Sequence, residues 1–330
     1  MKIKKDQGEH PMKKRVVVIS SAIIVPLMVI VLLIAGNYFY DQSVNRGVHV
    51  ELHTEPEAVS ALANQQNDLL DEAREWYETH KQEAIEWEQT SYDGLELKAT
   101  FFKNEQSDGK AVILAHGYKG NHEHMSDLVK FYFDQGFDIL MPDARGHGDS
   151  EGNYIGYGWH DRKDYQEWIK QLIEKNNSDR VFLHGNSMGA ALVLMTSGEE
   201  LPEAVKGIVA DSGYTSVKEE LSYQLKHLYH LPAFPLMDIT SLITKVKAGY
   251  TFEEASAVEQ VKENTKPLFI IHGAEDELVP TEMANTLYEH ASGEKKLWIV
   301  PKAGHTKAYA VATEEFQNKL SNFLDNALEE

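Results

Sequence analysis

Residues 181–197 read VFLHGNSMGAALVLMTS and decide the fold. A short apolar run at 181–184 is typical of a buried strand, and it leads directly into Gly185-Asn186-Ser187-Met188-Gly189. An apolar helical stretch follows. This is a G-x-S-x-G motif between a strand and a helix, where its two glycines permit a sharp turn that projects the serine from the sheet. The motif alone is common, but this setting predicts Ser187 as a nucleophile.

A serine hydroxyl is a weak nucleophile until a base removes its proton, so a histidine and a carboxylate should follow Ser187 in the chain. Asp276 follows a predicted strand at 268–271, and His305 follows another at 297–300. Each therefore lies at the carboxyl end of a strand, where open parallel sheets place their sites. The two neighbours of Asp276 are also acidic, Glu275 and Glu277, and the spacing alone does not separate the three.

Acyl transfer at a serine also needs backbone donors for the negative charge that develops on the carbonyl oxygen. The amide of Met188 stands at a predicted helix start, where the helix dipole favours negative charge. A second donor should follow an earlier strand. The run AVILAHGYKG at 111–120 provides such a turn, and we assign the amide of Tyr118.

From Ser91 onward, short β-branched and aromatic runs alternate with helical stretches. This alternation predicts an α/β fold with a mostly parallel central sheet and helices on both faces. The expected strands are 95–102, 111–115, 137–141, 181–184, 207–210, 268–271 and 297–300, and the expected helices include 161–175, 188–197, 281–290 and 307–328. About 55 residues separate two of these strands, at 213–266, which is far more than a simple crossover needs. We expect a helical lid there, with extra core as the plainer alternative.

The amino terminus has the charge pattern of a membrane anchor. Residues 16–40 contain no charged side chain, and the 20 residues from Val16 to Ala35 are almost wholly aliphatic. Such a stretch is about 30 Å long as a helix, which matches the hydrocarbon core of a bilayer. The sequence thus predicts one transmembrane helix at 16–40, with Tyr38, Phe39 and Tyr40 as an interfacial aromatic belt.

Two other interpretations of this stretch are weaker. A cleaved signal peptide usually has a shorter apolar region that ends at small residues, and a buried soluble helix rarely follows a basic tail. Six basic residues precede the stretch, whereas only Arg46 lies within the twenty residues after Tyr40. The positive-inside rule then places the amino terminus in the cytoplasm and the catalytic domain outside the cell.

Between the expected anchor and the first expected strand, the chain contains a linker and then a segment with helical periodicity. Residues 41–55 are expected to form a linker. Apolar residues then recur at three- and four-residue steps between Pro56 and about Gln89, which predicts an amphipathic helix. The expected organisation is a cytoplasmic basic tail at 1–15, an anchor at 16–40, a linker and helix at 41–90, and a catalytic domain at 91–330.

Composition excludes several classes of function. The 330 residues carry 52 acidic and 32 basic side chains, a formal net charge of -20, so nucleic acid is disfavoured as a partner. The chain has no cysteine, which excludes disulfides and thiolate metal sites. His227 and His230 could share a helix face, but no pattern of carboxylates accompanies them, so we expect no metal and no other cofactor.

Taken together, these motifs resemble the α/β-hydrolase superfamily, and within it the bacterial membrane-anchored serine hydrolases of the serine-aminopeptidase-like or esterase-like group. The resemblance covers about residues 92–328 and rests on five ordered motifs. They are His116-Gly117, the turn DARGHGDS at 143–150, Gly185 to Gly189 with Asp211-Ser212, Pro267 to Pro280, and Gly304-His305. It implies that Asp276 is the acid and that the 143–150 turn is structural. Asn186 stands where many relatives have histidine, at a variable position.

The expected function is a membrane-anchored extracytoplasmic serine hydrolase that cleaves a carboxylic ester through Ser187, His305 and Asp276. Its substrate would be a small-molecule ester or a short peptide. An aspartate nucleophile, as in epoxide hydrolases or dehalogenases, is disfavoured because a serine stands at that position. Two alternatives stay open: a serine aminopeptidase or amidase, and a non-catalytic surface protein that uses the same fold for binding.

Overall fold

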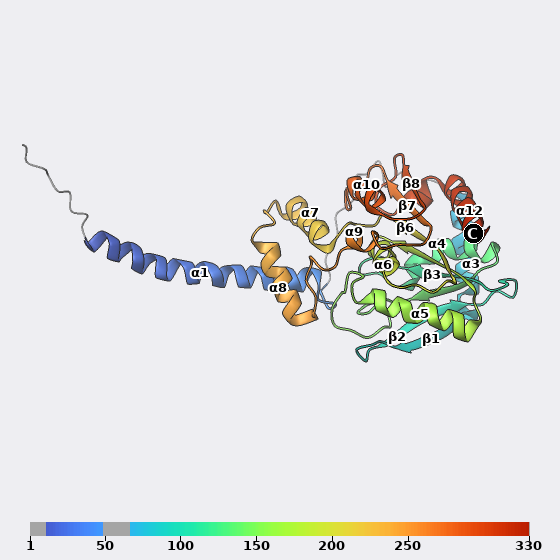
Figure 1. Cartoon of the computed structure of the whole chain (residues 1–330), viewed down its shortest axis with the longest axis horizontal. Coiled ribbons are helices and arrows are strands. Elements are labelled where there is room, and N and C mark those ends of the chain that lie inside the picture. Colours follow the sequence, from blue (N-terminus) through green and yellow to red (C-terminus); the bar gives the residue numbers. More distant parts are fainter. Residues whose placement is uncertain (1–10, 49–66, 330) are drawn as a thin grey trace, which may run out of the picture.

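The structure, a computed structural model, describes residues 11–48 and 67–329, with side chains from residue 24 onward. An eight-stranded sheet lies at the centre of the domain (Figure 1). Its strands are β1 (Ile85–Thr90), β2 (Glu96–Phe102), β3 (Lys110–Ala115), β4 (Asp138–Pro142), β5 (Arg180–Asn186), β6 (Val205–Asp211), β7 (Leu268–Gly273) and β8 (Lys295–Val300). The spatial order is β1-β2-β4-β3-β5-β6-β7-β8. Strand β2 runs antiparallel to β1 and β4, and the other neighbouring pairs are parallel, so the mostly parallel sheet predicted from the sequence is confirmed.

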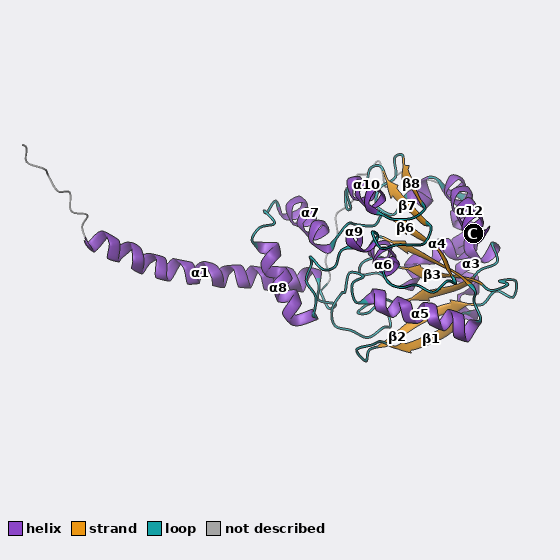
Figure 2. Cartoon of the chain, in the orientation of Figure 1, coloured by secondary structure: helices purple, strands orange, loops and turns teal. Residues whose placement is uncertain are grey.

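Helices cover both faces of this sheet (Figure 2). They are α3 (Asp68–His80), α4 (Ser126–Asp134), α5 (Asp161–Asn176), α6 (Met188–Ser197), α7 (Val217–Tyr229), α8 (Leu236–Ala248), α9 (Ala257–Gln260), α10 (Thr281–His290), α11 (Ala308–Val311) and α12 (Thr313–Glu329). Strand β3 shows how the two layers arise, because side chains alternate along a strand. Ala111 and Ile113 pack with residues of α5 and α6, whereas Val112 and Leu114 pack with residues of α3, α4 and α12.

Two segments differ from the expectation. Residues 85–90 were predicted to end an amphipathic helix, but that helix ends at His80 and β1 follows. The reason is alternation: Trp87 and Gln89 are buried while their neighbours are exposed, and the strand pairs antiparallel with β2. The carboxyl-terminal helix, predicted as one, is divided at Ala312 into α11 and α12.

The amino-terminal helix α1 runs from Pro11 to Ser43, beyond both ends of the expected span. Its segment Ile24–Ser43 is long and apolar enough to cross a membrane, with a mean hydropathy of 1.8, and most of its apolar side chains are exposed. The expected linker therefore begins after residue 43. Residues 1–10 of the basic tail, 49–55 of the linker and 56–66 of the expected helix lie outside the described residues.

The long insertion between β6 and β7 contains α7, α8 and α9. Helices α7 and α8 lie at the end of the domain from which α1 emerges, and α8 crosses α1 (Figure 1). The crossing is close at Gly36, where a Cβ atom would lie 2.7 Å from Cγ2 of Ile239. Helix α1 and the insertion therefore pack against each other.

The turn between β5 and α6 leaves no space at its two glycines. A Cβ atom on Gly185 would lie 2.1 Å from the carbonyl oxygen of Gly189, and one on Gly189 would lie 2.0 Å from the carbonyl oxygen of Ala115 in β3. Real Cβ atoms do not approach backbone oxygens so closely. The two glycines thus allow α6 to start directly against the ends of β3 and β5.

We predict that Gly189→Ala destabilises the fold by roughly 3 kcal/mol or more, because its methyl group would displace the rigid backbone of β3. Thermal unfolding of the purified protein measures this. Gly47→Ala is the control, since its Cβ atom would have no neighbour closer than 3.6 Å. An equal melting temperature for the two variants would contradict the close approach.

Candidate active site

Ser187 occupies the turn between β5 and α6 with a backbone conformation that is unfavourable for a residue with a side chain. Its φ is 56° and its ψ is -118°. Residues at such dihedrals cost free energy and occur mostly at functional sites. The amide of Ser187 donates a hydrogen bond of 2.8 Å to the carbonyl oxygen of Asp211 in β6, which fixes the turn to the neighbouring strand. The hydroxyl consequently projects beyond the carboxyl ends of the parallel strands.

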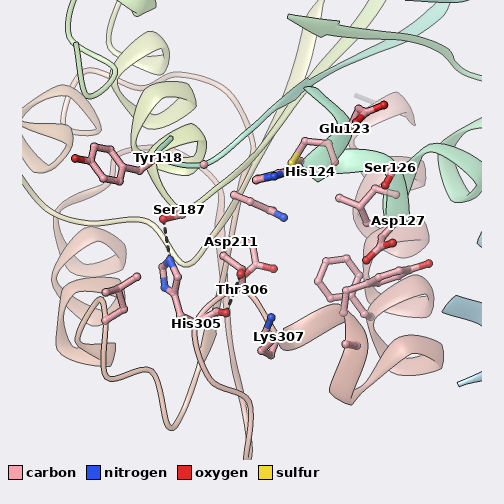
Figure 3. A pocket seen from close by; sticks show the side chains of 18 of the residues that line it. Tyr118, Glu123, His124, Ser126, Asp127, Ser187, Asp211, His305, Thr306 and Lys307 are labelled. Atoms are coloured by element: carbon pink, nitrogen blue, oxygen red, sulfur yellow. Dashed lines mark hydrogen bonds between the residues drawn. The ribbon is translucent and has the colours of Figure 1, made fainter. Parts of the chain in front are cut away.

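The structure brings Ser187, His305 and Asp276 together from three separate loops. The Oγ atom of Ser187 lies 2.8 Å from Nε2 of His305, and the two side chains point toward each other (Figure 3). The other ring nitrogen, Nδ1, lies 2.8 Å from Oδ2 of Asp276. A carboxylate only accepts hydrogen bonds, so Nδ1 carries the proton and Nε2 is free to accept from the serine hydroxyl. This is the arrangement in which a histidine can remove a proton from a serine.

Asp276 is buried and held in its ionised form. Its Oδ1 accepts hydrogen bonds from the amides of Leu278 at 3.0 Å and Val279 at 2.8 Å, and its Oδ2 also accepts from Nε2 of His272 at 3.2 Å. Burial opposes ionisation, but the two histidines and these hydrogen bonds outweigh it, so the pKa of Asp276 lies well below its usual value.

Only one of the three neighbouring acidic residues meets His305. Glu275 and Glu277 are exposed to solvent, whereas the side chain of Asp276 is buried beneath the loop. Burial therefore separates the three residues that spacing alone left equivalent.

Asp211 and Ser212 connect the serine turn to the histidine loop. The hydroxyl of Ser212 accepts a hydrogen bond of 3.1 Å from the amide of Thr306 and lies 3.0 Å from Oδ1 of Asp211, to which it donates. The carbonyl of Asp211 meanwhile accepts from the amide of Ser187. The Asp211-Ser212 pair thus links the backbones on either side of the reacting side chains.

Two buried histidines hold the loop after β3. Nε2 of His116 accepts from the amide of Ala144 at 3.0 Å, and Nε2 of His147 accepts from the amide of Lys119 at 3.2 Å. Burial lowers the pKa of His116 to about 4 and that of His147 to about 3, which keeps both rings neutral and able to accept. On the loop, the bonded residues are His116 and Lys119, which lie on either side of Tyr118, so the 143–150 turn fixes the loop that bears the Tyr118 amide.

The same turn is anchored by a buried ion pair. Nε and Nη2 of Arg145 each donate to one carboxylate oxygen of Asp164 at 2.8 Å. Asp143 accepts hydrogen bonds from the amides of His122 at 2.7 Å and Asp149 at 2.9 Å. The buried charged groups of the turn, Asp143 and Arg145, therefore have structural partners, and His147 faces the loop rather than Ser187.

Two cavities of opposite character meet at Ser187. The first has a volume of about 110 Å³ and is lined mainly by apolar and aromatic side chains from the end of α1, from α7 and from the loop after Asp276. The second has a volume of about 520 Å³, lies on the side of α4 and α11, and includes Arg74, His124 and Lys307 (Figure 3). Ser187 and Tyr118 line both cavities. A bound molecule could therefore place an apolar part and a polar part on opposite sides of the serine.

Glu220 of α7 is an acidic group that lines the apolar cavity. It is 7% exposed, and burial raises its pKa to about 8. Its Oε1 accepts from Nε2 of Gln224 at 3.0 Å, while its Oε2 is buried without a hydrogen-bond partner. Burial therefore favours the neutral form of this carboxyl group in the cavity.

Sequence reasoning missed several groups around the site. Phe39 and Tyr40 are expected in an interfacial aromatic belt, but Phe39 lines the apolar cavity and Tyr40 is buried in the core. Glu220 and His272 have no assigned role, and the helix that contributes Arg74 is given no chemistry. The acidic residue at 220 sits in an ordinary helical pattern, so only the fold reveals its position. Within residues 11–48 and 67–329, no group of three or more histidine or acidic side chains is placed to hold a metal ion.

The chain is similar in sequence to known hydrolases. A family model described as serine aminopeptidase, S33, matches residues 106–249. The uncharacterized protein YqkD of Bacillus subtilis is 29% identical over 216 residues, which is 65% of this chain and 71% of that protein. The lysophosphatidylserine lipase ABHD12 of Danio rerio is 26% identical over 241 residues, or 67% of this chain and 60% of the lipase.

Solved structures of hydrolases have a fold similar to that of this chain. The esterase Pf2001 of Pyrococcus furiosus superposes with a TM-score of 0.60 and 26% identity, over 74% of this chain and 92% of the esterase. The acylaminoacyl peptidase of Pyrococcus horikoshii superposes with a TM-score of 0.59 at 16% identity, over 75% of this chain and 42% of the peptidase. The second likeness concerns the fold alone.

The raised pKa of Glu220 predicts a pH dependence of stability. The folded chain binds the proton of Glu220 more tightly than the unfolded chain does, so its contribution to stability is complete below about pH 4 and is lost as the pH rises through about 8. Glu220→Gln removes this loss. We expect the difference in melting temperature, variant minus wild type, to increase from pH 5 to pH 9.

Thermal unfolding at pH 5, 7 and 9 measures the effect. Glu289→Gln, at an exposed position on α10, is the matched control and should follow the wild type at each pH. A constant difference between Glu220→Gln and the wild type across this range would show that Glu220 is ionised in the fold.

Proposed function

Because the chain is a serine hydrolase of the α/β-hydrolase superfamily, we propose that it cleaves a carboxylic ester through Ser187, His305 and Asp276 while α1 tethers it to a membrane. The observation that supports this most directly is the continuous pair of hydrogen bonds, each 2.8 Å long, from the serine hydroxyl through the imidazole to the carboxylate. The serine has a base within reach, and the base has an orienting group.

In the proposed reaction, Ser187 Oγ attacks the acyl carbon as its proton passes to Nε2 of His305. The negative charge of Asp276 stabilises the imidazolium that forms. The amides of Tyr118 and Met188 stabilise the tetrahedral oxyanion, the second with the help of the α6 dipole. The imidazolium then protonates the leaving alcohol, and the acyl group stays on Ser187. A water molecule gives one proton to His305 and attacks the acyl-enzyme, and the imidazolium then returns this proton to Ser187 Oγ as the bond to the acyl carbon breaks and the acid is released.

The two cavities favour an amphiphilic ester. The apolar cavity suits an acyl chain, and its only described acidic side chain, Glu220, is kept neutral by burial. The polar cavity suits the alcohol portion, because charged groups of both signs and hydrogen-bonding groups line it, including the paired Arg74 and Asp127. The names of the lipase and the esterase among the relatives point to the same substrate class.

We assign α1 as an uncleaved anchor. Its apolar residues extend into the membrane, whereas its carboxyl end packs on the domain: Gly36 meets Ile239, and Nζ of Lys247 donates to Asn37 at 2.7 Å. A cleaved signal peptide would leave these contacts empty. The six basic residues that precede the apolar stretch at 16–40 favour an amino terminus in the cytoplasm and a catalytic domain outside the cell.

An aminopeptidase activity is the second candidate, and Glu220 is the observation that favours it. A substrate with a free amine needs an acidic group near the nucleophile, and this carboxyl lines the cavity beside Ser187. Burial favours the protonated form of Glu220, and this supports the ester. The carboxyl group would have to lose its proton before it could pair with a substrate ammonium group.

We predict that Ser187→Ala lowers kcat for p-nitrophenyl esters by at least about a thousandfold, because no nucleophile remains. The full-length protein in detergent is assayed with esters of graded acyl length. Circular dichroism shows whether the variant is folded. Turnover that survives in a folded variant would exclude Ser187 as the nucleophile.

The second candidate has a separate test. Amino-acid p-nitroanilides are compared with the p-nitrophenyl esters of N-blocked and unblocked amino acids, on the wild type and on Glu220→Gln. For an esterase we expect esters to be cleaved far faster than anilides and the variant to treat blocked and unblocked esters alike. If Glu220 binds an amine, the variant would lose roughly tenfold or more of kcat/KM on the unblocked substrates alone.

A further inference from the structure

The end of the anchor helix forms part of the wall of the apolar cavity. Phe39, Gln42 and Ser43 line this cavity together with Ser187. Phe39 meets Tyr229 of α7 edge to face, with ring centroids 5.1 Å apart. The boundary of the cavity on this side is therefore a seam between the anchor and the insertion.

The same helix end is bonded to the loop after β3. The last carbonyl groups of a helix have no partner within the helix. Here the carbonyl of Ser43 accepts from the hydroxyls of Tyr118 and Tyr157, each at 2.8 Å, and the carbonyl of Gln42 accepts from Nζ of Lys119 at 3.3 Å. Two of these three donors, Tyr118 and Lys119, are thus residues that follow β3 beside Ser187.

The outer surface of the insertion is apolar where it flanks α1. The exposed side chains that form this lid patch are Tyr229, Leu231, Phe234, Leu242 and Val246. Phe234 is 78% exposed and Val246 is 81% exposed, and apolar side chains that gather on one surface, unlike single scattered ones, indicate an interaction site.

On α8, the apolar residues form one stripe with helical spacing. Ile239 and Ile243 face Gly36 of α1, and Leu242 and Val246 continue the stripe into the open. Residues three and four positions apart share a face of a helix, so the stripe extends the contact surface of the anchor without interruption. Figure 1 shows α8 crossing α1 at the end of the domain from which α1 leaves.

We propose that the lid patch lies in the leaflet of the bilayer that faces the catalytic domain, and that the enzyme takes the acyl chain of a membrane-resident ester through the seam between Phe39 and Tyr229. This inference rests on the proposed esterase function and anchor. A bilayer is the occupant that fits the patch, because α1 runs into the membrane beside it and brings the patch to the membrane surface in every anchored molecule. The acyl chain then passes from the leaflet to Ser187 without crossing water, and the polar portion enters the cavity lined by Arg74 and Lys307.

The position of the patch is tested without any assay of activity. Val246→Trp and Ile85→Trp are compared in the full-length protein, reconstituted in phosphatidylcholine vesicles that contain lipids brominated near the headgroup. Ile85 is the matched control, since it is an exposed apolar residue on β1 at the far side of the domain (Figure 1). We expect added quenching of tryptophan fluorescence for Val246→Trp only. Equal quenching in both variants would overturn the proposal, whatever else covers the patch.

The route of the acyl chain is tested by truncating a side chain that lines the seam. Phe39→Ala enlarges the cavity at the seam, and we expect the ratio of kcat/KM for dodecanoyl over butanoyl esters to rise roughly tenfold. Phe234→Ala is the control, because Phe234 belongs to the patch and does not line the cavity. An unchanged ratio in Phe39→Ala, with butanoyl turnover intact, would overturn the route alone. Failure of the wild type to cleave either ester would instead defeat the proposed function, and the substrate route with it.

Discussion

The close contact between β3, β5 and the start of α6 is the constraint on which the rest of the site depends. Gly185 and Gly189 bring these three backbones together with no room for a side chain, and Ser187 between them takes a positive φ. Strands β3 and β5 are adjacent and parallel, while the chain continues from β3 to β4 on the opposite side. The sheet order reverses there, and parallel sheets bind ligands at such points. The loops after β3, β5, β7 and β8 consequently meet at one place.

Features written in short, local patterns could be predicted from the sequence. The strand, glycine turn and helix around Ser187 are contiguous, and Asp276 and His305 each follow a clear apolar strand, so their meeting point follows from the fold alone. Strand β1 was missed because its single buried tryptophan, Trp87, falls in step with the preceding helix and thus imitates helical spacing. Its alternation becomes decisive only once β2 is seen to pair with it. An edge strand with one exposed face gives a weak periodic signal.

The walls of the cavities could not be predicted, because they join residues far apart in the sequence. Phe39 and Glu220 line the same space as Ser187, yet nothing in their neighbourhoods distinguishes them from an interfacial aromatic residue and an ordinary helical glutamate. Burial decides both roles. It makes the carboxyl group neutral, and it turns an aromatic residue of the anchor into part of a cavity. Such effects arise from packing between elements, which periodicity does not encode.

The anchor helix and the site form one hydrogen-bonded unit. A helix end leaves carbonyl groups that need donors, and here the donors are Tyr118, Tyr157 and Lys119. Tyr118 bears the backbone amide proposed to stabilise the oxyanion, and Lys119 is the next residue. Arg46, just beyond the helix, donates to the carbonyls of Gly148 and Ser150 in the turn that fixes the same loop. A flexible tether would need none of these bonds. Their presence means that the orientation of α1 and the geometry around Ser187 are set together, so a membrane that held the proposed anchor would also orient the site.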